Sequence, residues 1–172
     1  EVANRKRLMA RALLELQRRP FQLAQGGAGN HRHDAAVEGL VQRAKYAGFA
    51  YLYKKTDSAL RGNVGAELEA AIKAMDEHHG HSETLAVLVA SYPHSGRICV
   101  GGYQIVHGVP LERSPIAKDA ATPVHHTAVL KIIADQTSLP CGFVSLEKVL
   151  AGPAAVREAI EAARAKGCRA VV

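Results

Sequence analysis

The stretch from residue 49 to residue 75 constrains the fold most, because it joins an apolar run, a polar loop and a helical repeat. Residues 49–53 are short, aromatic-rich and preceded by Gly48, which predicts a buried strand. After the polar residues 54–63, apolar side chains recur on one helix face, at Val64, Leu68, Ile72 and Met75. This order predicts an α/β unit whose loop lies at the carboxyl end of its strand.

The polar loop has the chemistry of a site for a small anion. Lys54, Lys55 and Arg61 supply positive charge beside the amino end of the predicted helix, whose free N–H groups and dipole also favour an anion. The same side chains fit structural roles, because lysines extend into solvent and Asn63 can cap the helix. The loop chemistry alone leaves ligand binding and a purely structural role open.

Two long segments match, in the right order, the patterns of one known family. Residues 53–67 read Y-K-K-T-D-S-A-L-R-G-N-V-G-A-E and are similar to K-x-D-S-T-L-R-G-N-x-G-A-E. Residues 92–127 are similar to P-x-x-G-R-x-x-x-G-G-x-x-x-x-G-x-P-L followed by x-A-x-D-P-x-x-P-V-x-x-S. The sequence therefore resembles the four-carbon acid sugar kinases, first catalogued as a domain of unknown function. The resemblance covers residues 35–172, whereas residues 1–34, a predicted helix and a glycine-rich connector, do not match.

The resemblance implies the acid-sugar-binding part of a two-domain, ATP-dependent kinase for four-carbon sugar acids such as threonate, erythronate or keto-tetronates. ATP and Mg²⁺ are expected in the full-length protein only, with no metal bound by this part. The family's D-D-x-T-G-A segment and its C-terminal nucleotide-binding domain are not found, so the chain alone is expected to bind a sugar acid without catalysis. Because Val172 lies inside an apolar run, we expect the natural protein to continue. The alternative is a non-catalytic anion-binding or protein-interaction module.

The resemblance also marks candidate site residues. Asp57 and Lys54 are the expected catalytic side chains, Asp57 as a hydroxyl acceptor or base and Lys54 as a point charge. Arg61 suits a bidentate carboxylate clamp. The other substrate-binding candidates are Ser58, Gly62, Asn63, Gly96, Arg97, Gly101 and Gly102. The chain departs from the family patterns at Ala59, where a hydroxyl is missing that could alter substrate choice, and at Ile116, Ala120 and Thr127.

The remaining patterns extend the α/β alternation. Residues 85–90 predict a second strand covered on both faces, so that the loops 54–63 and 91–102 are expected at one rim of a parallel sheet. Gly101 and Gly102 predict a sharp turn or a close approach to a ligand, and another turn is expected near residues 107–108. Further helices are predicted at 2–19, 34–47, 128–136 with Thr127 as cap, and 153–166, and strands at 143–146 and 168–172. The predicted fold class is α/β, with three layers, a mainly parallel sheet and helices on both faces.

Composition excludes several classes of function. At 172 residues and 48% hydrophobic content, the chain can build one α/β core. The net charge of +6 suits anionic ligands, but dispersed basic residues and the lack of Trp argue against nucleic acid. Three widely spaced cysteines give no disulfide or zinc pattern and predict a reducing cytoplasm, and no stretch has the length of a membrane span. The histidines near residue 80 predict a solvated loop rather than a metal site. The sequence leaves open the exact substrate, its stereochemistry, the oxygen phosphorylated and whether the chain forms a homo-oligomer.

Overall fold

The structure, a computed structural model, describes residues 51–80 and 83–172. The predicted helices at 2–19 and 34–47, the glycine-rich connector and the boundary between residues 34 and 35 lie outside the described residues.

The described residues form a three-stranded parallel sheet between helices and a three-stranded antiparallel sheet, whose strands come between the first and second parallel strands along the chain. The parallel sheet has the order β1-β6-β5 and comprises β1 (Ala86–Val87), β5 (Cys141–Gly142) and β6 (Ala170–Val171). The antiparallel sheet comprises β2 (Arg97–Val100), β3 (Tyr103–Val106) and β4 (Val109–Pro110). The helices are α3 (Val64–His79), α4 (Val129–Ala134), α5 (Leu146–Leu150) and α6 (Pro153–Ala165), with short 3₁₀ turns at Pro93–Ser95, Leu111–Arg113 and Pro115–Lys118.

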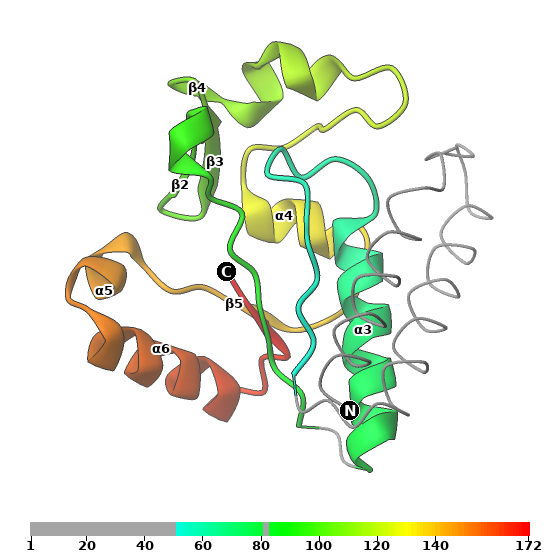
Figure 1. The fold of residues 1–172 in the computed structure, drawn as a ribbon, viewed down its shortest axis with the longest axis vertical. Coiled ribbons are helices and arrows are strands. Elements are labelled where there is room, and N and C mark those ends of the chain that lie inside the picture. The colour runs from blue at the N-terminus through cyan, green and yellow to red at the C-terminus, as the bar shows by residue number, and fades with distance from the viewer. Residues whose placement is uncertain (1–50, 81–82) are drawn as a thin grey trace, which may run out of the picture.

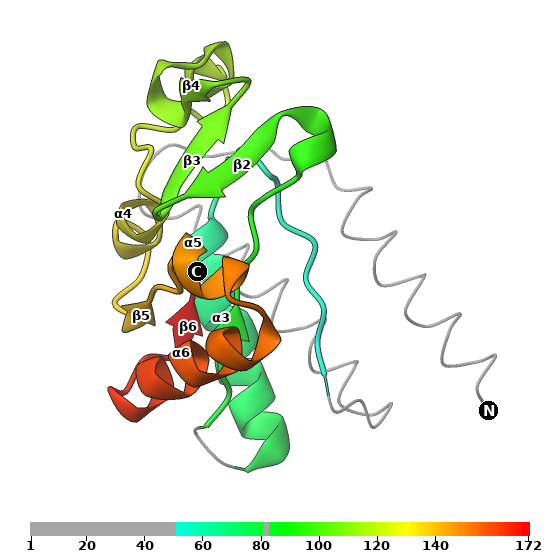
Figure 2. The ribbon, with the colours of Figure 1, turned by 90° about the vertical axis from the view of Figure 1, so that its left-hand side faces the viewer.

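The helices cover both faces of the parallel sheet. In Figure 1, α3 lies on one side of this sheet and α5 and α6 lie on the other. The chain turns from β1 into the antiparallel sheet, which Figure 2 shows beyond one end of the parallel sheet. The predicted α/β fold class is thus confirmed, and the antiparallel sheet adds to it. No helix of the described residues is long and apolar enough to cross a membrane.

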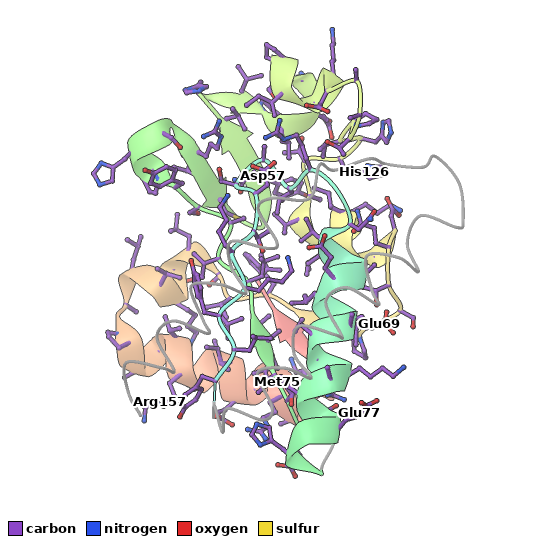
Figure 3. All side chains as sticks on the ribbon, turned by 45° about the vertical axis from the view of Figure 1, so that its right-hand side comes forward. Asp57, Glu69, Met75, Glu77, His126 and Arg157 are labelled. Atoms are coloured by element: carbon purple, nitrogen blue, oxygen red, sulfur yellow. The ribbon has the colours of Figure 1, made fainter. Side chains whose placement is uncertain are left out.

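Helix α3 forms where the apolar repeat predicted it. It presents Met75 inward and Glu77 outward, as Figure 3 shows, and it ends at Gly80, which adopts a left-handed conformation with φ of 70°. Its first turn carries Val64 into the main core together with Leu60. The close contact of α3 with α4 therefore begins directly after the polar loop.

Two tight turns shape the antiparallel sheet. Gly101 and Gly102 have φ of 59° and 80° and connect β2 to β3, so the structure confirms the sharp turn expected at these residues, and their approach to a ligand stays a prediction. His107 and Gly108 make the second turn, which confirms the prediction near residue 107.

The strand predicted at residues 49–53 is wrong for the part that the structure describes. Tyr51 and Tyr53 are 89% and 73% exposed and belong to no sheet, because β1, the parallel segment nearest in sequence, pairs with β6 instead. Strand β1 is itself shorter than predicted. The chain around β1 is covered on one face only, since the side chains of Val87 and Val89 are 58% and 76% exposed.

Two local predictions near the C-terminal half are also wrong. The strand expected at 143–146 lies instead at Cys141–Gly142, because Ser145 caps α5 by accepting a hydrogen bond from the Lys148 N–H. Helix α4 begins after Ala128 without a side-chain cap. Thr127 is buried and exchanges hydrogen bonds with Glu112, which keeps its hydroxyl away from the helix end.

Candidate functional site

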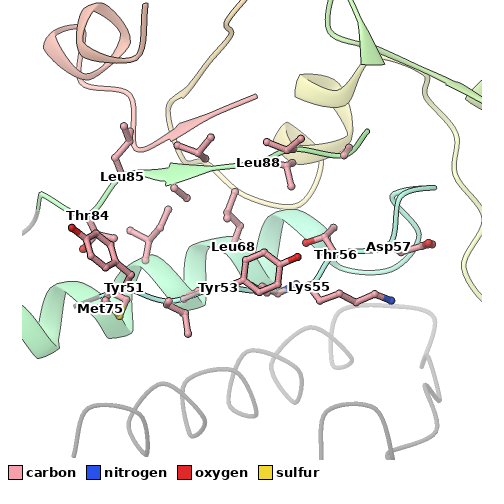
Figure 4. A pocket seen from close by; sticks show the side chains of 18 of the residues that line it. Tyr51, Tyr53, Lys55, Thr56, Asp57, Leu68, Met75, Thr84, Leu85 and Leu88 are labelled. Carbon is pink, nitrogen blue, oxygen red and sulfur yellow. The ribbon is translucent and has the colours of Figure 1, made fainter. Parts of the chain in front are cut away.

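A groove of about 990 Å³ runs between residues 51–58 and residues 84–92. Figure 4 shows Met75 and Thr84 towards one end and Thr56 and Asp57 towards the other. The first end is lined mainly by apolar side chains of α3 and of the chain around β1. The other end is polar, and it is here that we place the candidate site.

The polar end brings together both loops that carry the sequence motifs. Lys54, Asp57 and Ser58 line the groove from the first loop, and Arg97 lines it from the second. The side-chain amide of Gln104, on β3, donates hydrogen bonds to the carbonyl of Ser58 at 2.6 Å and to that of Ala90 at 3.2 Å. The two loops therefore lie side by side although they are far apart in the sequence. The other predicted residues, Arg61, Gly62, Asn63, Gly96, Gly101 and Gly102, are not among the groove lining.

The first loop is built around the Asp57 carboxylate. One oxygen accepts a hydrogen bond from the Ala59 N–H at 3.3 Å, and the other accepts one from Arg61 Nε at 2.6 Å. The Asp57 carbonyl accepts from the N–H of Leu60, which adopts a positive φ of 55° and is fixed by burial in the core. The motif residues thus close a turn, and Asp57 is held at its centre.

The surroundings of Asp57 keep it ionised. Burial opposes its charge, but the hydrogen bonds from Arg61 and from the Ala59 N–H outweigh burial, so the pKa of Asp57 lies below its ordinary value. A carboxylate with a low pKa is a poor proton acceptor at neutral pH but a good hydrogen-bond acceptor. The geometry therefore favours Asp57 as an acceptor for a ligand hydroxyl over Asp57 as a general base.

Arg61 lies between two carboxylates of the protein. Its Nε contacts Asp57, and its Nη1 donates to Asp119 at 3.1 Å, joining residues 58 positions apart. The bond to Asp57 and the contact with Asp119 raise the pKa of Arg61 above its usual range. Sequence reasoning missed Asp119, although it stands at the aspartate of the second quoted pattern. The clamp on a ligand carboxylate expected of Arg61 stays a prediction, since two protein carboxylates already occupy this guanidinium.

The two lysines of the loop differ in their contacts. Lys54 pairs with Glu67 in the first turn of α3 at 2.5 Å, which ties the loop to the helix. In the pattern K-x-D the lysine stands two residues before the aspartate, a position that Lys55 occupies in this chain. Lys55 lines the groove and is exposed. Lys55 is therefore the residue that corresponds to the motif lysine, and Lys54 is its neighbour with a structural ion pair.

Arg97 lines the groove, and no carboxylate in the described part of the chain neutralises its guanidinium. Its Nη1 donates to Ser95 Oγ at 2.9 Å, and its Nε is buried without a hydrogen-bond partner. Within residues 51–80 and 83–172, Arg97 forms no ion pair. A guanidinium in this state is a ready partner for an external carboxylate.

The end of the first loop is held by another amide. Gln136 donates to the Gly62 carbonyl at 2.9 Å and accepts from the Gly65 N–H at 2.7 Å. Asn63 stands at the cap position of α3 but makes no capping hydrogen bond, and its Nδ2 is buried without a partner. Gln136 therefore caps the first turn of α3, which is the role that the sequence predicted for Asn63. No periodic or motif signal distinguished this glutamine in the sequence.

The structure also shows where Ala59 and Gly102 lie, two further residues that the sequence analysis discussed. Ala59, where the family pattern has a hydroxyl, is 1% exposed and packs in the main core, so this position does not face the groove. Gly102 packs near the ring of Phe143 at the far turn of the antiparallel sheet. Among the described residues, no three metal-binding side chains are grouped so that they could hold an ion.

Comparisons with known proteins agree with the motifs. The sugar-binding N-terminal domain family matches residues 27–172. A D-erythronate kinase of Heliobacterium modesticaldum is 46% identical over 119 residues, which are 69% of this chain and 26% of that protein. A D-threonate kinase of Salmonella typhimurium is 39% identical over 101 residues, which are 59% of this chain and 22% of that protein. The chain thus spans about a quarter of the length of these curated relatives.

Solved structures agree with the fold. A Haemophilus influenzae protein from a family of unknown function matches 89% of this chain and 40% of its own with a TM-score of 0.73 at 19% identity, which concerns the fold alone. A Bordetella bronchiseptica domain of unknown function, described as a domain-swapped dimer with bound citrate, matches 84% of this chain and 33% of its own with a TM-score of 0.68 at 28% identity. On the extent of the family match, this chain belongs to the sugar-binding N-terminal domain family.

Proposed function

We propose that the chain is the acceptor-binding part of an ATP-dependent kinase that phosphorylates four-carbon sugar acids of the erythronate, threonate or 3-oxo-tetronate type. The names of the relatives support this substrate class. The observation that carries the proposal is that one groove is lined both by the ionised Asp57 and by Arg97, which pairs with no carboxylate of the described residues. A sugar acid offers the complementary pair of groups, a carboxylate and hydroxyls.

In the proposed complex, the ligand carboxylate binds Arg97 and the ligand hydroxyls bind Asp57 and Ser58. Lys55 adds positive charge from the exposed rim. ATP would supply the phosphoryl group: the ligand hydroxyl oxygen would bond to the γ-phosphorus, the bond to the ADP oxygen would break, and the hydroxyl proton would pass to solvent. In this step Asp57 and Ser58 orient the hydroxyl, and Lys55 offsets negative charge at the site.

The remaining components belong to the full-length protein. ATP is expected on a C-terminal nucleotide-binding domain, together with Mg²⁺. Asp57 and Asp119 are both held by Arg61, and no three metal-binding side chains of the described residues are grouped, so these two carboxylates do not fit a magnesium site. We also infer a cytoplasmic location, where ATP is available. A homo-oligomer is consistent with the dimer described for the Bordetella bronchiseptica relative.

Calorimetric titration with D-erythronate and D-threonate tests the proposal. We expect the wild-type chain to bind at least one acid and Arg97→Lys to bind it roughly 10- to 100-fold more weakly, because an ammonium cannot reproduce the planar guanidinium fork. Arg113→Lys, an exposed arginine away from the groove, is the matched control and should leave affinity unchanged. Circular dichroism checks that each variant is folded.

Phosphoryl transfer is tested in the full-length protein. The chain alone should show no ATP-dependent turnover, whereas the full-length protein should convert the acid that binds. Binding without turnover in the full-length protein would favour the non-catalytic module instead. Failure of the wild-type chain to bind either acid, or unchanged affinity in a folded Arg97→Lys variant, would overturn the proposed site.

A further inference from the structure

Gln104 is a fully buried polar side chain that lies between the two loops. It has no exposed surface and does not line the groove. Its Nε2 donates to the carbonyl of Ser58, in the first loop, and to the carbonyl of Ala90, at the start of the second. One nitrogen thus bridges Ser58 and Ala90, which are 32 residues apart in the sequence.

The orientation of this amide is fixed by chemistry. The opposite orientation would direct Oε1 at two carbonyl oxygens, which are acceptors and cannot donate to it. With Nε2 towards the carbonyls, Oε1 is buried and has no hydrogen-bond partner in the described structure. The fold therefore tolerates one unsatisfied acceptor in order to keep both bonds to the loops.

The support behind Gln104 is stiff. The residue lies on β3, the central strand of its sheet, and its backbone N–H donates to the Thr127 carbonyl at 2.9 Å. Its cross-strand partner Cys99 donates its backbone N–H to Ser91 Oγ at 3.0 Å, so the second loop is held from the neighbouring strand as well. A side chain on such a base can determine the spacing of the loops that it contacts.

We propose that Gln104 is a positioning residue that sets the spacing of the two groove loops, and through it the affinity for the sugar acid, without touching the ligand. The link to affinity rests on the proposed function, whereas the link to loop spacing does not. A residue that merely filled the core would tolerate an apolar replacement of similar volume. A residue that holds two carbonyls would not.

Two substitutions separate these roles. Gln104→Met keeps the volume and removes both hydrogen bonds. Gln104→Glu is nearly isosteric, and its carboxyl can donate one hydrogen bond when neutral and none when ionised. Burial beside two carbonyl oxygens raises the pKa of the introduced carboxyl, so this variant should regain loop order and affinity as pH falls from about 8 to about 5.5. The wild-type amide does not titrate and should show no such recovery.

The matched control is Val171→Ala, which removes fully buried volume from β6 and leaves both loop carbonyls untouched. Hydrogen exchange of the Leu60 and Tyr92 amides reports the two loops, because each donates within its own loop. D-Erythronate and D-threonate are the binding probes, measured by calorimetry on the same samples. All variants are compared at equal global stability, adjusted with urea.

We expect Gln104→Met to speed exchange at both amides and to weaken binding, each roughly tenfold, while Val171→Ala changes neither. Unchanged exchange in folded Gln104→Met would overturn the inference. If Gln104→Met does not fold, the inference would be overturned equally by a Gln104→Glu variant whose loop exchange and affinity do not change with pH. Faster exchange with unchanged affinity would overturn the link to binding. If the wild type binds neither acid, the proposed function fails, while the exchange data still decide whether Gln104 spaces the loops.

Discussion

Gly65 lies in the first turn of α3, where that helix passes α4. A Cβ atom at this residue would come within 2.8 Å of the Ile133 carbonyl oxygen and 3.0 Å of Gln136 Cβ. Replacing glycine by alanine in a helix interior normally stabilises by about 1 kcal/mol, and by less in a first turn. Overpacking costs about 1–3 kcal/mol, and here the closest atom belongs to a backbone that cannot rotate away. We therefore expect Gly65→Ala to lower the free energy of unfolding by about 1–2 kcal/mol.

Urea unfolding followed by circular dichroism measures this change. The difference in helix propensity between alanine and glycine is obtained from the unfolding free energies of Arg157→Ala and Arg157→Gly. Arg157, labelled in Figure 3, is an exposed position inside α6. The Gly65→Ala result minus this propensity difference gives the cost of the contact with α4. A Gly65→Ala variant that is more stable than the wild type would refute the reasoning, because it would show that α4 moves aside at little cost.

Two other substitutions test charge and backbone strain. Burial opposes the charge of Asp76, but hydrogen bonds from Thr84 and Arg169 outweigh burial and lower the pKa of Asp76. The ionised carboxylate therefore stabilises the fold above pH about 4, and this contribution is lost as the pH falls through the lowered pKa of the folded state. Asp76→Asn should therefore reduce the urea midpoint at pH 7 and flatten its decline towards pH 2, and a decline as steep as that of the wild type would contradict this. Gly96→Ala should destabilise by more than about 1 kcal/mol, because φ is +67° and a Cβ would lie 2.4 Å from His107 Nδ1. The control Gly108→Ala has φ of +79° and open space, so equal losses in thermal melts would show that the contact at Gly96 costs nothing.

The parts of the fold that the sequence predicted well are those governed by local signals. The helix beginning at Val64 and the turn at His107 follow from side-chain periodicity and glycine placement, both of which act over a few residues. The exposed segment around Tyr51 could not be predicted, because a strand exists only where a second strand pairs with it. The contact of Arg61 with Asp119 could not be predicted either, because it depends on how distant segments come together in the fold.

The candidate site was predictable in its loops but not in what holds them. Both loops follow apolar runs and carry motif residues, and these local signals correctly predicted that the two loops lie side by side. Gln104 lies in a short strand of mixed character, and a buried amide there looks like any surface polar residue in the sequence. Only the carbonyls that it meets, at Ser58 and Ala90, reveal its role.

Uncharged amides hold the backbone of the first loop at two points, Ser58 and Gly62. Gln104 binds the carbonyls of Ser58 and Ala90, and Gln136 binds that of Gly62. Neither amide gains or loses a proton in the physiological range, and dissolved ions screen such bonds little. Asp57, Arg61 and Lys54 also hold this loop through their own contacts. The exposed Lys55 is therefore the charged side chain of the loop that can be exchanged while the backbone that carries it keeps its shape. For redesign of substrate preference, this division separates residues that can be varied from residues that should be left alone.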